Sequence, residues 1–319
     1  MAPTVSVIVP NYNYARYLPQ RLESIFNQTY DDYEVIILDD KSTDDSAAVI
    51  EQYRSHPKVS KIVINSENSG SPFIQWEKGL GYARGKYAWI AEADDLMEPT
   101  FLEKAVKVME EGPGDMRLTM ALSYIIDGDG NITDRKGYDR RIWPTGGAVV
   151  YSGSNFIAAN MWEGNGVYNA SQVLFSIDAF KQVANTDYRK MRYCGDWLFW
   201  IEIVRNGNVG VIREKLNRFR KHGKSVTDEG HAKLDAAMKE SRHVQTHILS
   251  SDAAIPAGVK RMLRYRIARA LKCDFSNPAL QMLNINSRNF VWLWIYKHWF
   301  FSGSYRKTIE ALHPLAEFD

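Results

Sequence analysis

The chain has 319 residues, of which 45% are hydrophobic and 24% charged, as in ordinary globular proteins. Its net charge of +2 excludes the strongly basic field of a general nucleic-acid binder. Two cysteines exclude a disulfide framework and favour a reducing, cytoplasmic setting. No apolar run reaches about 18 residues, so we expect no spanning helix. A strand pattern starts almost at the N-terminus, so we also expect no signal peptide.

The N-terminal third alternates between strand and helix patterns. Apolar, β-branched runs typical of buried parallel strands occupy 5–9, 33–38, 61–64 and 86–90. Apolar residues at helical spacing and turn signals predict helices near 18–28, 42–54 and 72–84. This βαβαβαβ order predicts an α/β fold, with a mostly parallel central sheet flanked by helices.

After a helix expected near 100–111, the pattern becomes less regular. We expect strands at 118–126, 172–177, 209–212 and 216–219. We expect helices from 178, at 195–206, at 229–249 and at 259–271. Residues 132–170 are rich in Gly, Trp and Asn and are predicted to be irregular.

Polar and acidic residues follow three of the predicted strands, at 10–13, 39–40 and 92–95. Ligands of such sheets bind beyond the carboxyl ends of the strands. Asp94 and Asp95 lie side by side after a buried strand and repel each other, so they need a positive partner, such as a divalent cation that carries phosphate oxygens. A helix N-cap is the alternative, but it needs only one Asp and leaves Glu92 unexplained.

The turn after Val9 has neither the Gly-x-Gly-x-x-Gly pattern nor a P-loop. It offers an aromatic face and amides, while the nearby acids suit a base N–H, ribose hydroxyls or a metal. The combination indicates a nucleotide diphosphate bound through base and ribose, with a cation on the diphosphate. The turn Asp127–Asn131 looks like a calcium loop but lacks the downstream acid, so we expect no metal there.

The motifs together resemble the family 2 inverting glycosyltransferases, which have the GT-A fold. The resemblance covers residues 4–228 and rests on Val5–Asn13, Ile37–Asp44 and Glu92–Asp95, while Asn68–Gly79 is similar to one bacterial subgroup. It implies a metal-dependent enzyme that moves a sugar from a nucleotide-diphosphate sugar to a hydroxyl of a glycan or lipid-linked acceptor in surface polysaccharide biosynthesis. UDP-sugars are the favoured donors, with GDP- and dTDP-sugars as alternatives.

The resemblance also implies a division into parts. A GT-A domain would occupy 1–228, with a nucleotide-binding half over about 1–115 and an acceptor and catalytic half over about 116–228. A helical, basic and aromatic extension would follow over 229–319.

For the donor, the resemblance implies that Pro10 and Tyr12 line the base and that Asp40 accepts a hydrogen bond from it. Asp94 would hold the ribose, and Asp95 would bind Mn²⁺ or Mg²⁺. From the residues alone, Tyr12 could equally be a core tyrosine, and Asp40 a charge at a helix N-terminus. Asp39 would orient the loop.

Other positions extend the donor site. Lys78 would contact the diphosphate, with a solvated helix position as the alternative. Glu92 stands where Asp is commoner, and its task at the metal is open. His222 would bind the metal or the diphosphate. Its neighbours would neutralise the diphosphate or let the loop close over the donor: Arg220, Gly223 and Lys224.

The resemblance places the catalytic base at Asp196, in Gly195–Trp200, with Gly195 where Glu is frequent. A carboxylate there would take the proton of the attacking hydroxyl. Asp196 would also suit a helix N-cap, which is the alternative. We expect acceptor contacts at three further positions: Trp162, Asn165 and Asn169.

The C-terminal part is basic and aromatic. Residues 256–307 hold ten Lys or Arg against one acid, Asp274, and 290–301 is dense in Trp, Tyr and Phe. Such a surface suits peripheral contact at the inner face of a membrane. The alternatives are burial of these aromatics against the catalytic domain or a second copy, and a joint to further domains.

Two other functions compete with glycosyl transfer. A sugar-nucleotide pyrophosphorylase would need a Gly-rich, basic loop after the first strand, which 10–13 lacks. A non-catalytic glycan-binding module of the same fold would tolerate loss of Asp95 and Asp196, and both are present.

Overall fold

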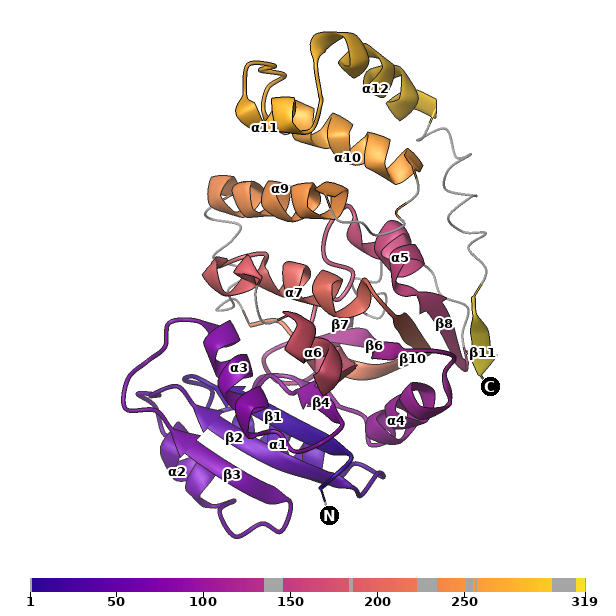
Figure 1. The fold of residues 1–319 in the computed structure, drawn as a ribbon. Coiled ribbons are helices and arrows are strands. Elements are labelled where there is room, and N and C mark those ends of the chain that lie inside the picture. Colours follow the sequence, from indigo (N-terminus) through magenta and orange to yellow (C-terminus); the bar gives the residue numbers. More distant parts are fainter. Residues whose placement is uncertain are drawn as a thin grey trace.

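The structure is a computed structural model that describes residues 2–134, 146–183, 186–222, 234–250, 255, 257–299 and 314–318. Its described part is built on one mixed, 11-stranded sheet (Figure 1). The strand order is β11-β8-β10-β6-β9-β4-β1-β2-β3, with β5 paired to β10 and β7 to β6. Helices cover both faces of the sheet, as the alternating sequence pattern predicts.

The N-terminal strands and helices follow the predicted order closely. The parallel strands are β1 (Val5–Asn11), β2 (Tyr33–Asp39), β3 (Val59–Ile64) and β4 (Tyr87–Ile90). The helices between them are α1 (Leu18–Phe26), α2 (Ser46–Glu51) and α3 (Pro72–Tyr82). The strands β1, β2 and β4 are buried over their whole length, which explains their continuous apolar runs, whereas β3 at the sheet edge is partly exposed.

The second half extends the same sheet. It contributes β5 (Leu96–Met97), α4 (Phe101–Glu111), β6 (Met116–Ile126), β7 (Ile132–Asp134), β8 (Ala148–Ser152), β9 (Val173–Ser176) and β10 (Asn208–Arg220). The strands β6 and β10 run parallel to each other, whereas β8 and β9 are antiparallel to their neighbours. Since most strands still share the direction of β1, the prediction of a mostly parallel sheet is confirmed.

Two predictions for this half are wrong. The strands expected at 209–212 and 216–219 form the single strand β10, which tolerates the interruption through bulges between Ile212 and Asn217. The segment expected to be irregular contains β8, which pairs with β10, and a helical stretch made of α5 (Gly153–Phe156) and a π-helical turn. Residues 135–145 of that segment lie outside the described residues.

Helices pack on the sheet in two sets that create two cores. On one face, α1 and α4 cover Val7, Val9 and Trp89. On the other, α3, α6 (Ile177–Val183) and α7 (Gly195–Val204) cover Ile8 and Ile36. Alternating side chains of the strands β1 and β2 therefore enter opposite cores, and these cores fix the positions of the loops at the strand ends.

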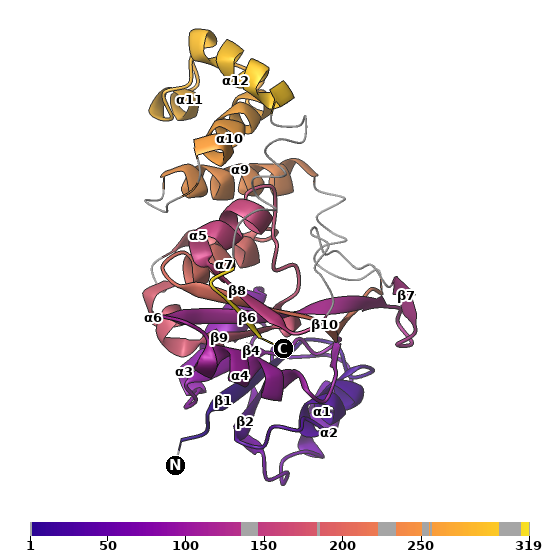
Figure 2. The ribbon, with the colours of Figure 1, turned by 90° about the vertical axis from the view of Figure 1, so that its right-hand side faces the viewer.

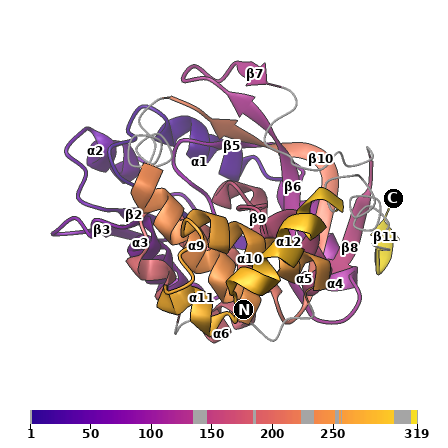
Figure 3. The same cartoon turned by 90° about the horizontal axis from the view of Figure 1, so that it is seen from above.

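The C-terminal helices stack on α7, away from the sheet (Figures 1 and 2). They are α9 (Leu234–Ser250), α10 (Ala257–Ala270), α11 (Pro278–Met282) and α12 (Ser287–Trp299). Seen from above, α9, α10 and α12 lie over the middle of the molecule (Figure 3). None of the helices in the described part of the chain combines the length and apolarity needed to cross a bilayer.

The extension expected over 229–319 needs one correction. Residues 316–318 form the strand β11, which pairs antiparallel with β8 at the edge of the sheet. Residues 316–318 thus lie beside β8, away from the helices that precede them, as Figure 1 shows. The helices expected in this extension are present as α9 to α12, whereas Ala316–Phe318 is too short a run to predict a strand, and its partner β8 had not been predicted either.

Candidate active site

The first two strand ends are tied together by a loop network. Asn11 Nδ2 donates to Asp39 Oδ1 at 2.7 Å, and Asp39 also accepts from the backbone N–H and the hydroxyl of Ser42. Asp39 therefore orients its loop, as expected. Pro10 is buried at the end of β1, whereas the Tyr12 side chain is 46% exposed at the rim. An exposed ring at this place is available to stack on a base, which disfavours the core-tyrosine alternative.

Asp40 is the acceptor of a second network. Its carboxylate is 5% exposed and accepts hydrogen bonds from Asn65 Nδ2 at 2.7 Å, Gln75 Nε2 at 2.8 Å and both the N–H and the hydroxyl of Ser69. Lys78 joins the edge of this network through a hydrogen bond to Asn65. Asp40 thus has a fixed orientation, and Lys78 lies beside the Asp40 network rather than among the acids at the end of β4.

Asp94 is the carboxylate of the acidic cluster that faces a histidine. Its Oδ2 lies 2.9 Å from His222 Nε2, which joins the end of β4 to the end of β10. The imidazole stacks on Tyr17 with ring centroids 5.4 Å apart, and Tyr14 meets it edge-on at 5.5 Å. Two aromatic rings from the β1–α1 region thereby hold His222 in place.

Asp95 has a different environment from its neighbour. It is 1% exposed, and its carboxylate accepts from Asn169 Nδ2 at 2.8 Å, from the Ser171 hydroxyl at 2.7 Å and from the Arg220 N–H at 2.9 Å. Burial, and next the charge of Asp94, raise the pKa of the Asp95 carboxyl. Both oxygens already have donors from the protein, so Asp95 ties the end of β4 to β10 and to residues 169–171.

Glu92 completes the acidic cluster from the other side. Trp76 Nε1 on α3 donates to Glu92 Oε1 at 2.9 Å, and burial raises the pKa of Glu92 to about 8, with Asp94 adding to the effect. This contact gives the longer side chain a partner that is not the metal. The open question about Glu92 thus has a structural answer: it anchors the acidic cluster to α3.

Sequence reasoning missed the positive charge behind this cluster. Arg21 is fully buried on α1, with its Cζ 4.8 Å from the centre of the Trp89 ring, and its charge lowers the pKa of both Glu92 and Asp95. The sequence does contain a sign of this buried charge, because Arg21 shares the apolar face of α1 with Leu18, Leu22 and Ile25. An arginine at a core position of an amphipathic helix indicates a buried counter-charge.

Arg220 holds the rim together instead of facing the diphosphate. Its guanidinium donates to the carbonyls of Asp94, Asp127 and Gly128 and to Gln20 Oε1, and the residue is 1% exposed. The role expected for it in neutralising the diphosphate is thereby corrected. Lys224, which shared that expectation, and Gly223, which was expected to let the loop close over the donor, lie outside the described residues.

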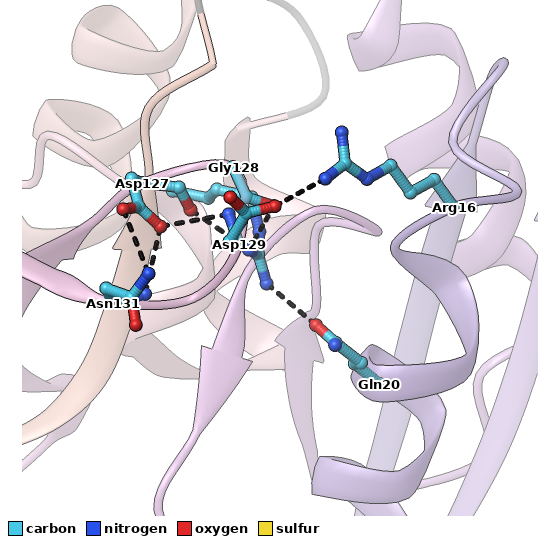
Figure 4. Close-up of polar contacts among 7 residues, drawn as sticks. Arg16, Gln20, Asp127, Gly128, Asp129 and Asn131 are labelled. Atoms are coloured by element: carbon cyan, nitrogen blue, oxygen red, sulfur yellow. Dashed lines mark hydrogen bonds and ion pairs between the residues drawn. The ribbon is translucent and has the colours of Figure 1, made fainter.

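The turn that resembled a calcium loop is satisfied from within (Figure 4). Asp127 Oδ1 accepts the N–H groups of Asp129 and Asn131, each at 2.9 Å, while Arg16 on the facing segment pairs with Asp129 at 2.6 Å. The turn therefore connects the end of β6 to the segment just before α1.

The spacing of Asp94 and His222, at the ends of β4 and β10, fits two ligands of one divalent cation. Ligands of Mg²⁺ lie roughly 2.0–2.1 Å from the ion, so two adjacent ligands lie about 3 Å apart, as Asp94 Oδ2 and His222 Nε2 do at 2.9 Å. Within the described ranges, no group of three or more His, Cys, Asp or Glu is arranged to hold a metal. A cation bound here would therefore take its remaining ligands from water and from substrate phosphates, as Mg²⁺ usually does.

Asp196 lies at the first turn of α7. Asn165 Nδ2 donates to its Oδ2 at 2.8 Å, and burial raises the pKa of the carboxyl to about 6. Of the three residues expected to contact an acceptor, Asn165 binds Asp196, Asn169 is bound to Asp95, and Trp162 is only 6% exposed within the core. A carboxylate with a pKa near 6 is poised to accept a proton at neutral pH.

Close packing requires a glycine at position 195. A Cβ at this position would lie 2.5 Å from Phe73 Cε2 and 2.5 Å from the Tyr188 carbonyl oxygen. The first turn of α7 therefore approaches α3 so closely that a larger residue does not fit. This explains the departure from the Glu that is frequent at this position.

The segment 68–79, which is similar to one bacterial subgroup, connects all parts of the site. On α3, Gln75 binds Asp40, Trp76 binds Glu92, and Phe73 packs against Gly195. One helix thereby sets the positions of the Asp40 network, the acidic cluster and the helix that carries Asp196. The sequence predicted this helix but not its role, because the role depends on contacts between distant strands.

A model of the family described as glycosyl transferase family 2 matches residues 6–164. An uncharacterized glycosyltransferase of Haemophilus influenzae is 29% identical over 285 residues, which cover 88% of this chain and 84% of that protein. Chondroitin synthase of Escherichia coli is 28% identical over 238 residues, which cover 68% of this chain and 33% of that protein.

Solved structures share the fold. Staphylococcus aureus TarS 1–349 in complex with UDP-GlcNAc superposes with a TM-score of 0.59 and 19% identity, over 86% of this chain and 73% of that one. The mannosyltransferase PcManGT from Pyrobaculum calidifontis, in complex with GDP-Man and Mn²⁺, has a TM-score of 0.55 and 17% identity, over 97% of this chain and 86% of that one. Together with the motifs at the strand ends, these matches place residues 6–164 in the glycosyl transferase family 2, and the solved structures show the same fold over most of the chain.

Proposed function

We propose that this glycosyltransferase is a metal-dependent, inverting enzyme that transfers a hexosyl group from a nucleotide-diphosphate sugar to a hydroxyl of a glycan or lipid-linked saccharide. The observation that carries the proposal is the arrangement around α3, where one helix contacts the Asp40 network, the acidic cluster and the helix of Asp196. A site with these three parts can bind a base, a charged diphosphate and a nucleophile in fixed relative positions.

For the donor, Tyr12 and Pro10 would line the base, and Asp40 would receive its N–H in exchange for one of the protein donors that hold its carboxylate. Asp94 and His222 would hold a divalent cation that neutralises charge on the diphosphate as it leaves. This assignment moves the metal from Asp95 to Asp94, since all hydrogen bonds of Asp95 go to the protein, whereas Asp94 faces His222. The ribose then remains without an assigned partner. Lys78 would help to orient Asp40 through its hydrogen bond to Asn65.

For the transfer itself, Asp196 would accept the proton of the attacking hydroxyl. In an inverting reaction the hydroxyl oxygen bonds to the anomeric carbon on the face opposite the departing diphosphate, so the base must approach from the acceptor side. Asp196 is attached to α7, in the half expected to bind the acceptor, and Asn165 orients its carboxylate. A pKa of about 6 makes this carboxylate a stronger base than an ordinary Asp, while it is still mostly ionised at neutral pH.

The solved structures support the choice of donor class. They contain UDP-GlcNAc and GDP-Man with Mn²⁺, so the same fold holds either nucleotide sugar. We favour a UDP-sugar, with GDP- and dTDP-sugars as alternatives. The likeness to a chondroitin synthase supports an acceptor in polysaccharide biosynthesis.

The proposal is tested by a thermal-shift screen of UDP-, GDP- and dTDP-sugars with and without Mn²⁺, followed by assay of nucleoside diphosphate release. We expect one donor class to raise Tm, and to do so more strongly with Mn²⁺. Formation of a nucleotide sugar from nucleoside triphosphate and sugar phosphate would instead show a pyrophosphorylase. Full activity in excess chelator would contradict the metal assignment.

A further inference from the structure

The outer face of α12 is an apolar strip without a cover among the described residues. Val291, Trp292 and Ile295 are 53%, 72% and 47% exposed, and they are neighbours on one side of the helix. Only Leu293 of this stretch is buried, against the helices below. Exposed tryptophan and branched aliphatic side chains in one patch mark an interaction surface rather than scattered surface residues.

Basic side chains border this strip. A cavity of about 690 Å³ lies between α10 and α12 and is lined by Arg261 and Arg264 as well as Trp292 and Ile295. Arg288 is exposed one turn before Val291. Among the residues that the structure describes, none of these three arginines takes part in an ion pair. The Arg261 guanidinium lies over the Tyr296 ring, 5.1 Å from its centre, which leaves its N–H groups, like those of Arg264 and Arg288, free of a carboxylate partner among the described residues.

The strip lies at the end of the molecule farthest from β1–β3, as Figures 1 and 2 both show. An external planar surface can approach it there without contacting the N-terminal strands. The helices α10 and α12 bury only some of their aromatic side chains against each other: Phe290 stacks on Tyr265 with ring centroids 5.7 Å apart, while Trp292 stays exposed.

We propose that the α10–α12 surface binds the face of an anionic phospholipid bilayer, with Trp292 and its apolar neighbours at the headgroup boundary and Arg261 and Arg264 on lipid phosphates. Exposed aromatics beside arginines fit both parts of such an interface. A symmetric dimer through the same face is disfavoured, since it would bring equivalent arginines of the two copies near one another. The inference is independent of the proposed transfer reaction.

The test is flotation of the full chain with vesicles of phosphatidylcholine alone and of phosphatidylcholine mixed equally with phosphatidylglycerol, at low and at physiological salt. We expect binding to the anionic vesicles that weakens with salt. Trp292→Ser should weaken the partition by roughly tenfold. Arg261→Gln with Arg264→Gln should weaken it by roughly fivefold for each charge removed.

Two matched variants control for general effects. Leu234→Ser removes an apolar side chain that is 60% exposed on α9, and Lys107→Glu reverses an exposed charge on α4. Both should float like the wild type. Circular dichroism and Tm identify any variant that fails to fold. The arginine substitutions and Trp292→Ser are made in separate proteins, so that if one variant fails to fold, the other still tests the surface.

Three results would overturn the proposal. Folded wild-type protein that does not float with anionic vesicles at low salt excludes the bilayer. Equal flotation of the Trp292 and arginine variants and the wild type assigns binding to another surface. Sedimentation of the wild type as a dimer that Trp292→Ser converts to a monomer, without vesicle binding, identifies a second copy as the partner.

Discussion

Asp94 and Asp95 are adjacent in the chain but have opposite tasks in the structure. Asp94 faces His222 at 2.9 Å, whereas Asp95 is buried and bound by Asn169, Ser171 and the Arg220 N–H. The sequence identifies the pair but does not show which carboxylate has which role, because the partners of Asp95 lie far along the chain. The difference gives a test in which each residue is the control for the other.

Asp94→Asn should leave Tm nearly unchanged and reduce transfer by more than about 100-fold, because a metal ligand is lost. Asp95→Asn should lower Tm by roughly 2–8 °C, since its amide places N–H groups against buried donors. Differential scanning fluorimetry and a nucleoside diphosphate release assay measure both effects. The reverse pattern would return the metal to Asp95.

Asp196 predicts the pH dependence of transfer. Burial raises its pKa to about 6, so the carboxyl is protonated below that value and cannot accept the proton of the acceptor. We expect kcat/KM to be level above the pKa and to fall as pH decreases through about 6, approaching tenfold per pH unit. A profile that stays flat to well below pH 5 would place the base elsewhere.

At the scale of elements, α3 and α7 meet at Gly195. Gly195→Ala should destabilise the protein by about 1–3 kcal/mol, because the added Cβ meets the Tyr188 carbonyl, a backbone atom with little freedom to move. Gly81→Ala on α3 is the matched control, since its Cβ would meet nothing within 4 Å. That change should stabilise by about 0.5–1 kcal/mol. Chemical denaturation measures both, and destabilisation of equal size in the two variants would contradict the packing account.

The helix α9 holds α7, the helix that carries Asp196, at both ends. The Glu240 carboxylate accepts the N–H groups of Arg192, Tyr193 and Cys194 just before α7, and His247 pairs with Glu202 at 2.7 Å further along it. The helix α9 is therefore bound to α7 and to the residues just before it. Glu240 is a positioning residue for Asp196.

Glu240→Gln should lower kcat more than it raises KM for the donor, because the donor half of the site is untouched. The negative charge of Glu240 also contributes to the raised pKa of Asp196, so the acidic limb of the pH profile should move to lower pH. A change in Tm alone, with unaltered kinetics and pH profile, would reduce Glu240 to a structural contact.

For the whole molecule, local patterns predicted the fold better than the site. Helix and strand signals predicted the N-terminal elements because the apolar runs of β1 and β2 are buried on both faces. They missed β8 and β11, since a short edge pair depends on its partners more than on its own residues. At the site, the residue types were found, but the roles of Arg21, Trp76 and Arg220 arise from tertiary contacts that no local pattern encodes.

Donor and metal should stabilise the whole molecule together. A ligand at about 100 times its Kd stabilises the folded state by about 2.7 kcal/mol. We expect UDP with Mn²⁺ to raise the Tm of the wild type and UDP alone to raise it little. In the His222→Ala variant, UDP with Mn²⁺ should raise Tm little more than UDP alone. An equal rise with UDP in chelator would contradict a cation at Asp94 and His222.

The most direct test of the account combines binding and turnover in Asp196→Asn. Calorimetry should show that the variant binds its donor with Mn²⁺ as the wild type does, because Tyr12, Asp40 and Asp94 are intact. Release of nucleoside diphosphate should fall by more than about 100-fold, since no base remains to take the proton. Unimpaired release by a variant that binds donor normally would contradict the assignment of Asp196 as the base.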